Sequence, residues 1–153
     1  MNSEYEPAMR VALEHAEQAA RAGDVPVGAV VLRDGEIIAA RHNEREAMND
    51  PTAHAEVLAL RDAAQVLGTW HLDDCTLVVT LEPCAMCAGA ALNSRIDTIV
   101  FGADDFKAGA EGSLYNLCSD PRLNHNPAVI HGVLALESVV VLQQFFEQRR
   151  NSS

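Results

Sequence analysis

Residues 75–93 read CTLVVTLEPCAMCAGAALN and join an apolar run to a segment rich in alanine and cysteine. Residues 75–80 form a short apolar run rich in β-branched side chains, which predicts a buried strand. Glu82-Pro83 follows almost at once, and because proline is tolerated in the first turn of a helix, the pair predicts a helix over residues 83–93. The alanines and the glycine of this helix permit close packing. A buried strand that leads directly into a helix indicates an α/β protein.

A helix and a hairpin are predicted near the beginning of the chain. Apolar residues at three- and four-residue intervals between residues 4 and 22 predict an amphipathic helix that ends at Gly23. Two β-rich runs follow, at residues 25–33 and 36–41. Asp34-Gly35 separates them, and this dipeptide accommodates the positive φ angles of a tight hairpin turn.

A second helix is predicted to begin at Asp50-Pro51, because aspartate caps free backbone amides and proline is tolerated at the first helical position. It is expected to end at Leu67 or Gly68. The helical period places Glu56 beside the apolar stripe of this helix, where burial is expected to raise its pKa, and places His54 on the other edge. Ideal helix geometry therefore separates these two side chains by a wide angle.

Two further strands and a last helix are predicted after residue 93. Residues 97–101 predict a strand, and residues 102–127, rich in Gly, Asp and Asn, predict a long functional loop with a short helical piece. A fifth strand is expected within residues 129–134. Residues 136–150 contain three consecutive valines that favour strand, but the length of the segment favours a helix. This order predicts a three-layer α/β domain over residues 1–153, with a five-stranded mixed sheet between helices.

Size, charge and cysteine use narrow the class of protein. The 153 residues are 48% hydrophobic, which suffices for one core and is too little to suggest two domains. The net charge is −11, so no general attraction to phosphate backbones is expected, and any contact with nucleic acid must be local. No apolar run reaches the roughly 20 residues of a membrane-spanning helix, and no secretory signal is evident. We therefore expect a soluble cytoplasmic protein without membrane contact, whose four cysteines are thiols or metal ligands.

Cys84 and Cys87 are spaced i, i+3 at the start of the predicted helix, so both sulfurs can face one point. The positive end of the helix favours their thiolate forms. Upstream, His54-Ala55-Glu56 completes the pattern His-x-Glu then Pro-Cys-x-x-Cys, which is the signature of zinc-dependent nucleobase deaminases. His54, Cys84 and Cys87 would bind one Zn²⁺ per chain. Three protein ligands leave the fourth tetrahedral position to water, which is typical of a catalytic site.

This pattern predicts hydrolytic deamination. The metal lowers the pKa of water, Glu56 accepts the proton, and hydroxide attacks the ring carbon that carries an exocyclic amine. Glu56 then delivers protons to the ring nitrogen and to the leaving amine, which departs as ammonia.

Two non-catalytic interpretations remain open. A fourth ligand supplied by His71, Cys75, Cys118 or His125 would make the zinc site structural, and Cys-x-x-Cys alone also occurs in redox dithiols. Either would make the protein a zinc or redox module.

The chain also resembles a known family, the bacterial tRNA-specific adenosine deaminases of the TadA type, within the cytidine deaminase-like superfamily. Most of the resemblance is carried by DPTAHAE at residues 50–56 and TLEPCAMCAGA at residues 80–90. It extends along most of the chain through VPVGAVV at 25–31, Asn43, SRI at 94–96, FGA at 101–103, GSLYN at 112–116, Asn124-His125 and FFEQRR at 145–150.

The resemblance implies a homodimeric enzyme that converts adenosine to inosine at the wobble position, 34, of a tRNA anticodon loop splayed into the pocket. It implies that Asn43 hydrogen-bonds the flipped base, although spacing alone favours a turn-shaping role for this residue. It further implies that Asp105 lies near the neighbouring ribose and that the backbone of Ala85 helps to hold the attacking oxygen. The partner would be the tRNA anticodon stem-loop, with the last helix beside the RNA.

Two features depart from the family. Glu44-Arg45-Glu46 is more acidic than is usual at the rim of the site, and no lysine-rich tail follows Arg150. Both weigh against an RNA substrate and leave the zinc chemistry untouched. They favour the alternative that the same fold deaminates a free base or nucleoside, such as guanine, cytosine or cytidine.

Overall fold

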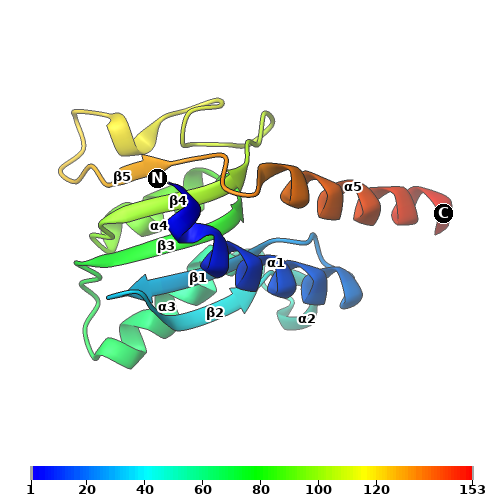
Figure 1. Cartoon of the computed structure of the whole chain (residues 1–153), viewed down its shortest axis with the longest axis horizontal. Helices are drawn as coiled ribbons and strands as arrows, with labels where there is room; N and C mark the ends of the chain where they lie inside the picture. The colour runs from blue at the N-terminus through cyan, green and yellow to red at the C-terminus, as the bar shows by residue number, and fades with distance from the viewer. Residues whose placement is uncertain (1, 153) are drawn as a thin grey trace.

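A sheet of five strands in the order β2-β1-β3-β4-β5 forms the middle of the molecule (Figure 1). The computed structural model describes residues 2–152. In it β1 (Gly28–Arg33) pairs antiparallel with β2 (Glu36–His42) and with β3 (Cys75–Leu81). β4 (Thr98–Ala103) pairs parallel with β3 and with β5 (Ala128–Ile130). The predicted five-stranded mixed sheet is therefore confirmed.

Helices cover both faces of this sheet and make the predicted three layers (Figure 1). α1 (Glu6–Arg21) and α5 (Ala135–Ser152) lie on one face, and α5 continues past the end of the sheet. α3 (Ala55–Leu67) and α4 (Ala85–Asn93) lie on the other. The remaining elements are short: η1 (Asn2–Tyr5), α2 (Arg45–Met48) and η2 (Leu117–Ser119). Within residues 2–152 we find no helix long and apolar enough to cross a bilayer.

The central strands are buried on both faces, so the alternation of their side chains divides the core in two. Val78 on β3 is in register with Val30 and Val100, and these three valines pack toward α1. Leu77 and Ile99, in register with each other, point to the opposite face and pack with α3 and α4. All five side chains are fully buried. Strands covered on both faces have few polar positions, which explains the nearly continuous apolar run at residues 75–80.

Two backbone features near the first helix require glycine. The predicted hairpin turn is confirmed, because Asp34 and Gly35 both have positive φ, at 53° and 78°. Gly28 lies where α1 packs against β1, and a Cβ atom there would lie 1.8 Å from the carbonyl oxygen of Ala12. Only a residue without a side chain lets the helix approach the strand this closely.

The two helices that flank the site begin later than predicted. α3 begins at Ala55, not at Pro51, because Asp50 accepts 2.8 Å hydrogen bonds from the amide and the hydroxyl of Thr52 and so makes a local turn. α4 begins at Ala85, not at Pro83. The helix ends were predicted correctly, since Gly68 closes α3 in a left-handed conformation. Residues 104–127 form the expected long loop, and η2 is its short helical piece.

Candidate metal centre and its pocket

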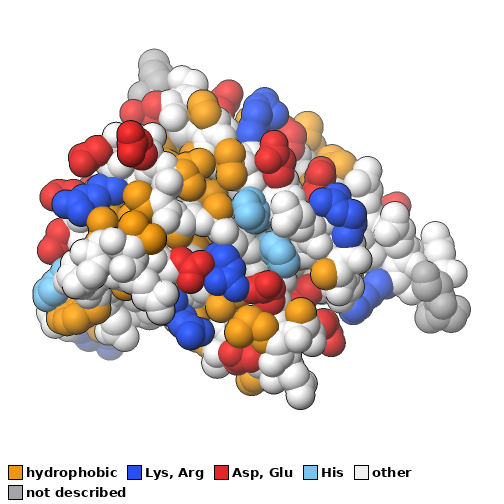
Figure 2. Space-filling model, turned by 90° about the horizontal axis from the view of Figure 1, so that it is seen from below, with side chains coloured by type: hydrophobic (Ala, Val, Ile, Leu, Met, Phe, Trp, Pro, Cys, Tyr) orange, Lys and Arg blue, Asp and Glu red, His pale blue; other side chains and the backbone are white. Residues whose placement is uncertain are grey.

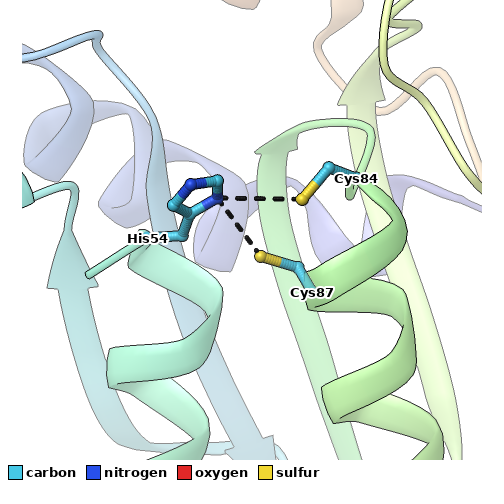
Figure 3. Close-up of side chains that lie close together, drawn as sticks. All are labelled: His54, Cys84 and Cys87. Carbon is cyan, nitrogen blue, oxygen red and sulfur yellow. Dashed lines mark hydrogen bonds between the residues drawn. The ribbon is translucent and has the colours of Figure 1, made fainter. Parts of the chain in front are cut away.

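His54 and Cys84 occupy matching positions, at the N-terminal ends of α3 and α4 (Figure 3). Each is the N-cap of its helix and has an extended backbone, with ψ of 147° and 176°. Their side chains therefore leave the helix ends and point toward each other, and Cys87 joins them from the first turn of α4. Nδ1 of His54 lies 3.8 Å from Sγ of Cys84 and 3.4 Å from Sγ of Cys87. The three residues of the sequence motif therefore lie together in one cluster.

The spacing of these three atoms fits a tetrahedral metal ion. Zinc bonds of about 2.0 Å to nitrogen and 2.3 Å to sulfur at a tetrahedral angle require a nitrogen-to-sulfur distance of about 3.5 Å. The two observed distances lie on either side of that value. All three ligand atoms lie within 4.8 Å of one another, and two sulfurs with one imidazole form a typical zinc donor set. The cluster could therefore hold a metal.

None of the residues considered for a fourth ligand joins this cluster. Over residues 2–152, no other His, Cys, Asp or Glu side chain groups with the three ligands. Cys75 is buried in β3, Cys118 bonds to Glu111, and His125 Nε2 lies 2.6 Å from the carbonyl oxygen of Ile96. His71 stacks on Trp70. The described part of the chain therefore offers three protein ligands, as a catalytic site requires, and not four.

The electrostatics of the cluster favour a thiolate. A hydrogen bond from Cys87 is the largest influence on Cys84, and together with His54 it lowers the pKa of Cys84 to about 3 against the opposing effect of burial. The hydrogen bond with Cys84 in turn raises the pKa of His54. A negative sulfur beside an imidazole attracts a cation, and a bound cation would favour loss of the remaining thiol proton.

Glu56 is brought to the same place. It is the second residue of α3, its side chain is 4% exposed, and its carboxyl group contacts Cys87. Burial is the largest influence and raises the pKa of Glu56 above its ordinary value, as the sequence predicted. The wide angle expected between Glu56 and His54 is absent, because His54 precedes the helix and does not follow its period.

A cavity of about 140 Å³ opens beside the cluster. Among its lining residues are five of the seven site residues that the sequence analysis singled out: Asn43, His54, Glu56, Cys84 and Asp105. Cys87 lies behind them and is fully buried. Ala85, the seventh, is exposed at the first position of α4, where a backbone amide has no partner within the helix.

Asn43 connects the wall of the cavity to the start of α3. Its side chain is 6% exposed, and Oδ1 accepts a 2.8 Å hydrogen bond from the amide of Ala55. Nδ2 donates to the carbonyl oxygen of Val25 at 3.0 Å. The residue therefore helps to hold the backbone next to His54. An amide nitrogen carries two hydrogens, so the bond to Val25 leaves one to donate.

Two charged residues of the wall were not predicted. Glu82, which is 2% exposed, accepts a 2.9 Å hydrogen bond from the amide of Asp105. Burial acts to raise its pKa, but the hydrogen bonds that it accepts from the loop after β4 outweigh burial and lower it. Arg45 donates from Nε and Nη2 to Oδ1 of the buried Asp24, at 3.1 and 3.0 Å. Glu82 belongs to the TLEPC motif, so the sequence shows that it is close to Cys84. The sequence does not show which groups donate hydrogen bonds to it.

Of the acidic rim expected at Glu44-Arg45-Glu46, Glu44 and Arg45 are paired within the protein. Arg45 bonds to Asp24, and Glu44 forms an ion pair with Arg41, which also contacts Asp62 at 2.9 Å. The view from below likewise shows Lys and Arg side chains next to Asp and Glu side chains, with no basic patch on that face (Figure 2). Pairing reduces the repulsion that unpaired carboxylates would exert on an anionic substrate.

Comparison with known proteins identifies relatives over nearly the whole chain. The family model described as MafB19-like deaminase matches residues 3–150. The tRNA-specific adenosine deaminase of Bacillus subtilis (strain 168) is 48% identical over 142 residues, which cover 93% of this chain and 88% of that protein. The structure of a tRNA:A34 deaminase, from a study of A-to-I editing at the wobble position of transfer RNA, aligns with a TM-score of 0.85 and 42% identity. That alignment covers 88% of this chain and 97% of the other. A guanine deaminase from Nitrosomonas europaea aligns with a TM-score of 0.79 and 28% identity, over 93% and 83% of the two chains.

Proposed function

The chain belongs to the family of the tRNA-specific adenosine deaminases, and from this membership we propose that it hydrolyses adenosine 34 of a tRNA anticodon loop to inosine and ammonia. The observation that carries the proposal is the convergence of His54, Cys84 and Cys87 with the buried carboxyl group of Glu56 at one cavity. A relative at 48% identity named for tRNA supports this substrate more strongly than a guanine deaminase at 28% identity supports a free base.

We propose that the metal is zinc, one ion per chain, held by Nδ1 of His54 and the sulfurs of Cys84 and Cys87. When bound, zinc supplies a Lewis acid that makes water a nucleophile near neutral pH. Two observations support this proposal: the donor atoms have the spacing that such an ion needs, and His54 and Cys84, at the N-termini of two helices, both line the cavity.

Glu56 moves the protons. Its carboxylate accepts the proton that water loses as the oxygen bonds to C6 of the adenine ring, and it passes a proton to N1 of the ring. Glu56 then carries the second proton, which the new C6 hydroxyl group loses, to the 6-amino group; the C6–N bond breaks, and ammonia leaves while a carbonyl forms at C6. A raised pKa suits this role, because the group must both take and give a proton near neutral pH.

Three residues are proposed to hold the substrate. The remaining N–H of Asn43 donates to the base, Asp105 lies beside the ribose of the neighbouring nucleotide, and the backbone amide of Ala85 donates to the attacking oxygen. Asn43 and Asp105 line the cavity, and the amide of Ala85 is unpaired within its helix, which supports these assignments.

We also propose that residues 1–153 act as one deaminase domain, that two copies form a homodimer, and that the protein works in the cytoplasm, where its tRNA substrate is. Exposed apolar side chains near the cavity support an assembly: Met86, Phe106, Leu114 and Tyr115 are between 38% and 77% exposed. Light scattering after gel filtration measures the mass, and a value near 16.5 kDa would speak against the dimer.

A substrate panel tests the proposed function. The zinc-loaded protein is incubated with an anticodon stem-loop that carries adenosine 34, and in parallel with adenosine, guanine, cytosine and cytidine. Inosine in the stem-loop and released ammonia are measured, with a stem-loop that carries guanosine 34 as the negative control. Ammonia from a free base or nucleoside alone would replace the tRNA proposal by the alternative, and no turnover of any compound would overturn the proposed chemistry.

A further inference from the structure

All the hydrogen bonds that the carboxylate of Glu82 accepts come from one segment, residues 105–113. Oε1 accepts from the amide of Asp105 at 2.9 Å and from the hydroxyl of Ser113. Oε2 accepts from the amides of Glu111 and Ser113, at 3.0 and 3.1 Å. Four donors therefore converge on one buried side chain, and none of them is charged.

The segment is built to fit around this carboxylate. A Cβ atom on Gly109 would lie 2.3 Å from Cδ and Oε2 of Glu82, so the backbone at residue 109 passes where a side chain would collide. The amide of Ala110 donates to the carbonyl oxygen of Pro83 at 2.9 Å, and Gly109 forms a β-bridge with Cys84. The segment is thus joined to the three residues that end in the first cysteine ligand.

The same segment supplies one wall of the cavity. Asp105 and Ala108 line it opposite Asn43 and Glu56, and the side chain of Asp105 turns back to accept bonds from the amides of residues 107 and 108. The segment's other ties to residues 83 and 84 are made by the backbone: the bond from Ala110 to Pro83 and the β-bridge between Gly109 and Cys84. The position of this wall relative to the metal ligands therefore depends on Glu82.

We propose that Glu82 is a positioning residue that sets the distance between the 105–113 wall and the metal cluster, and thereby the fit of the substrate. This inference rests on the proposed function of the cavity. It separates two tasks of the TLEPC motif: Cys84 binds the metal, while Glu82, two residues earlier, holds the wall that faces it. Loss of the carboxylate is expected to weaken substrate binding while leaving the metal in place.

Glu82→Gln provides the test. The glutamine oxygen can still accept bonds, but its NH₂ group is a donor that faces donors, so at least one of the loop amides loses its acceptor. Zinc content is expected to remain near one per chain, and KM for the stem-loop is expected to rise by about 10- to 100-fold with a smaller change in kcat. The matched control is Glu111→Gln, the same change on a buried side chain of the same segment that bonds to Cys118 and does not line the cavity. KM of the control is expected to change less than about twofold.

Proteolysis gives a second measurement that does not depend on turnover. Lys107 is the single lysine of the chain and lies in the middle of the segment, so endoproteinase Lys-C can cut the protein at this one position. Cleavage of a folded protein reports local opening of the backbone around the cleavage site. Glu82→Gln is expected to be cut at least about tenfold faster than the wild type under conditions where both remain folded, and Glu111→Gln no faster than the wild type.

The outcomes are distinct. Faster cleavage with unchanged KM would overturn the proposal, because the wall would then be mobile without consequence for binding, and so would unchanged cleavage. If Glu82→Gln loses its zinc or does not fold, Ser113→Ala replaces it as the test, because this substitution removes only the hydrogen bond from the hydroxyl group. An unchanged KM and an unchanged cleavage rate in Ser113→Ala would also overturn the proposal. If the wild type does not act on the stem-loop, the proposed function fails independently. KM is then measured with whichever compound of the panel is deaminated, and Lys-C cleavage still tests the role of Glu82.

Discussion

Replacing Glu111 with glutamine is expected to stabilise the protein at pH 8 by an amount that mostly disappears at pH 5. The side chain of Glu111 is 6% exposed, and burial raises its pKa to about 7. The bond from Cys118 partly opposes burial, and the charge of Glu82 adds to it. Oε2 of Glu111 has no hydrogen-bond partner among the described residues. The environment of Glu111 in the folded protein therefore destabilises the charged form of its carboxyl group.

The magnitude follows from the two pKa values. An ordinary glutamate in the unfolded chain has a pKa of 4.5, so between pH 4.5 and about 7 the folded protein binds more protons than the unfolded one. Stability must then fall as the pH rises through this window. With 1.36 kcal/mol per pKa unit, ionisation of Glu111 costs about 3 kcal/mol at pH 8 and about 1 kcal/mol at pH 5. Glutamine does not titrate, so the free energy of unfolding of Glu111→Gln relative to wild type is expected to rise by about 2 kcal/mol from pH 5 to pH 8.

Urea unfolding of the zinc-loaded proteins at pH 5, 6, 7 and 8 measures this difference. Effects that do not depend on pH, such as the hydrogen bond that glutamine keeps or loses with Cys118, cancel between the ends of the series. Glu36→Gln, at the exposed start of β2, is the control for removing one negative charge from a chain of net charge −11. A stability difference between Glu111→Gln and wild type that stays constant over the four pH values would refute the reasoning.

Three further substitutions test the site and the packing. Glu56→Ala is expected to keep zinc near one per chain, measured by metal analysis, and to lower kcat by about a thousandfold or more; surviving activity would mean that another group moves the protons. Cys87→Ala is expected to lose both metal and activity and to melt at a lower temperature, because bound zinc contributes folding free energy, and a full zinc content in this variant would exclude Cys87 as a ligand. Gly28→Ala is expected to lower the free energy of unfolding, measured in urea, by about 3 kcal/mol or more, because the new Cβ would collide with the carbonyl oxygen of Ala12. Gly89→Ala is the control: its Cβ would have no atom within 4 Å, so stability is expected to stay the same or to rise.

The strands and most helix ends were predictable because they depend on local patterns. A strand buried on both faces must be apolar, so residues 75–80 could be assigned without knowledge of what covers them. The start of α3 was predicted wrongly because two local signals compete at Asp50: the same carboxylate can cap a helix or bond to Thr52 in a turn. The bond from Ala55 to Asn43, which helps to fix where the helix begins, comes from a residue outside the predicted helix. No period within the helix can show it.

The metal ligands were predictable for a related reason. Their identity follows from side-chain chemistry and from short spacings within residues 54–56 and 84–87. The sequence did not show that His54 and Glu56 converge, since that depends on His54 being a cap with extended backbone. Glu82 was missed because the amides that it bonds lie 23 to 31 residues later in the chain. Its donors are mainly backbone amides, which every residue except proline has, so no residue type in the sequence marks them.

The net charge of −11 was the strongest argument in the sequence against an RNA substrate, and the structure changes its weight. A total charge counts each carboxylate equally, whereas an approaching phosphate responds to the unpaired ones within about 10 Å. Near the cavity Asp24 pairs with Arg45, and Glu44 pairs with Arg41, whereas Glu82 keeps its charge because the groups that donate to it are uncharged. These carboxylates serve to hold α2 and the 105–113 wall in place. Part of the net negative charge is therefore used in ion pairs that stabilise the structure. The repulsion that a polyanion meets at the cavity is weaker than the net charge of the sequence suggests.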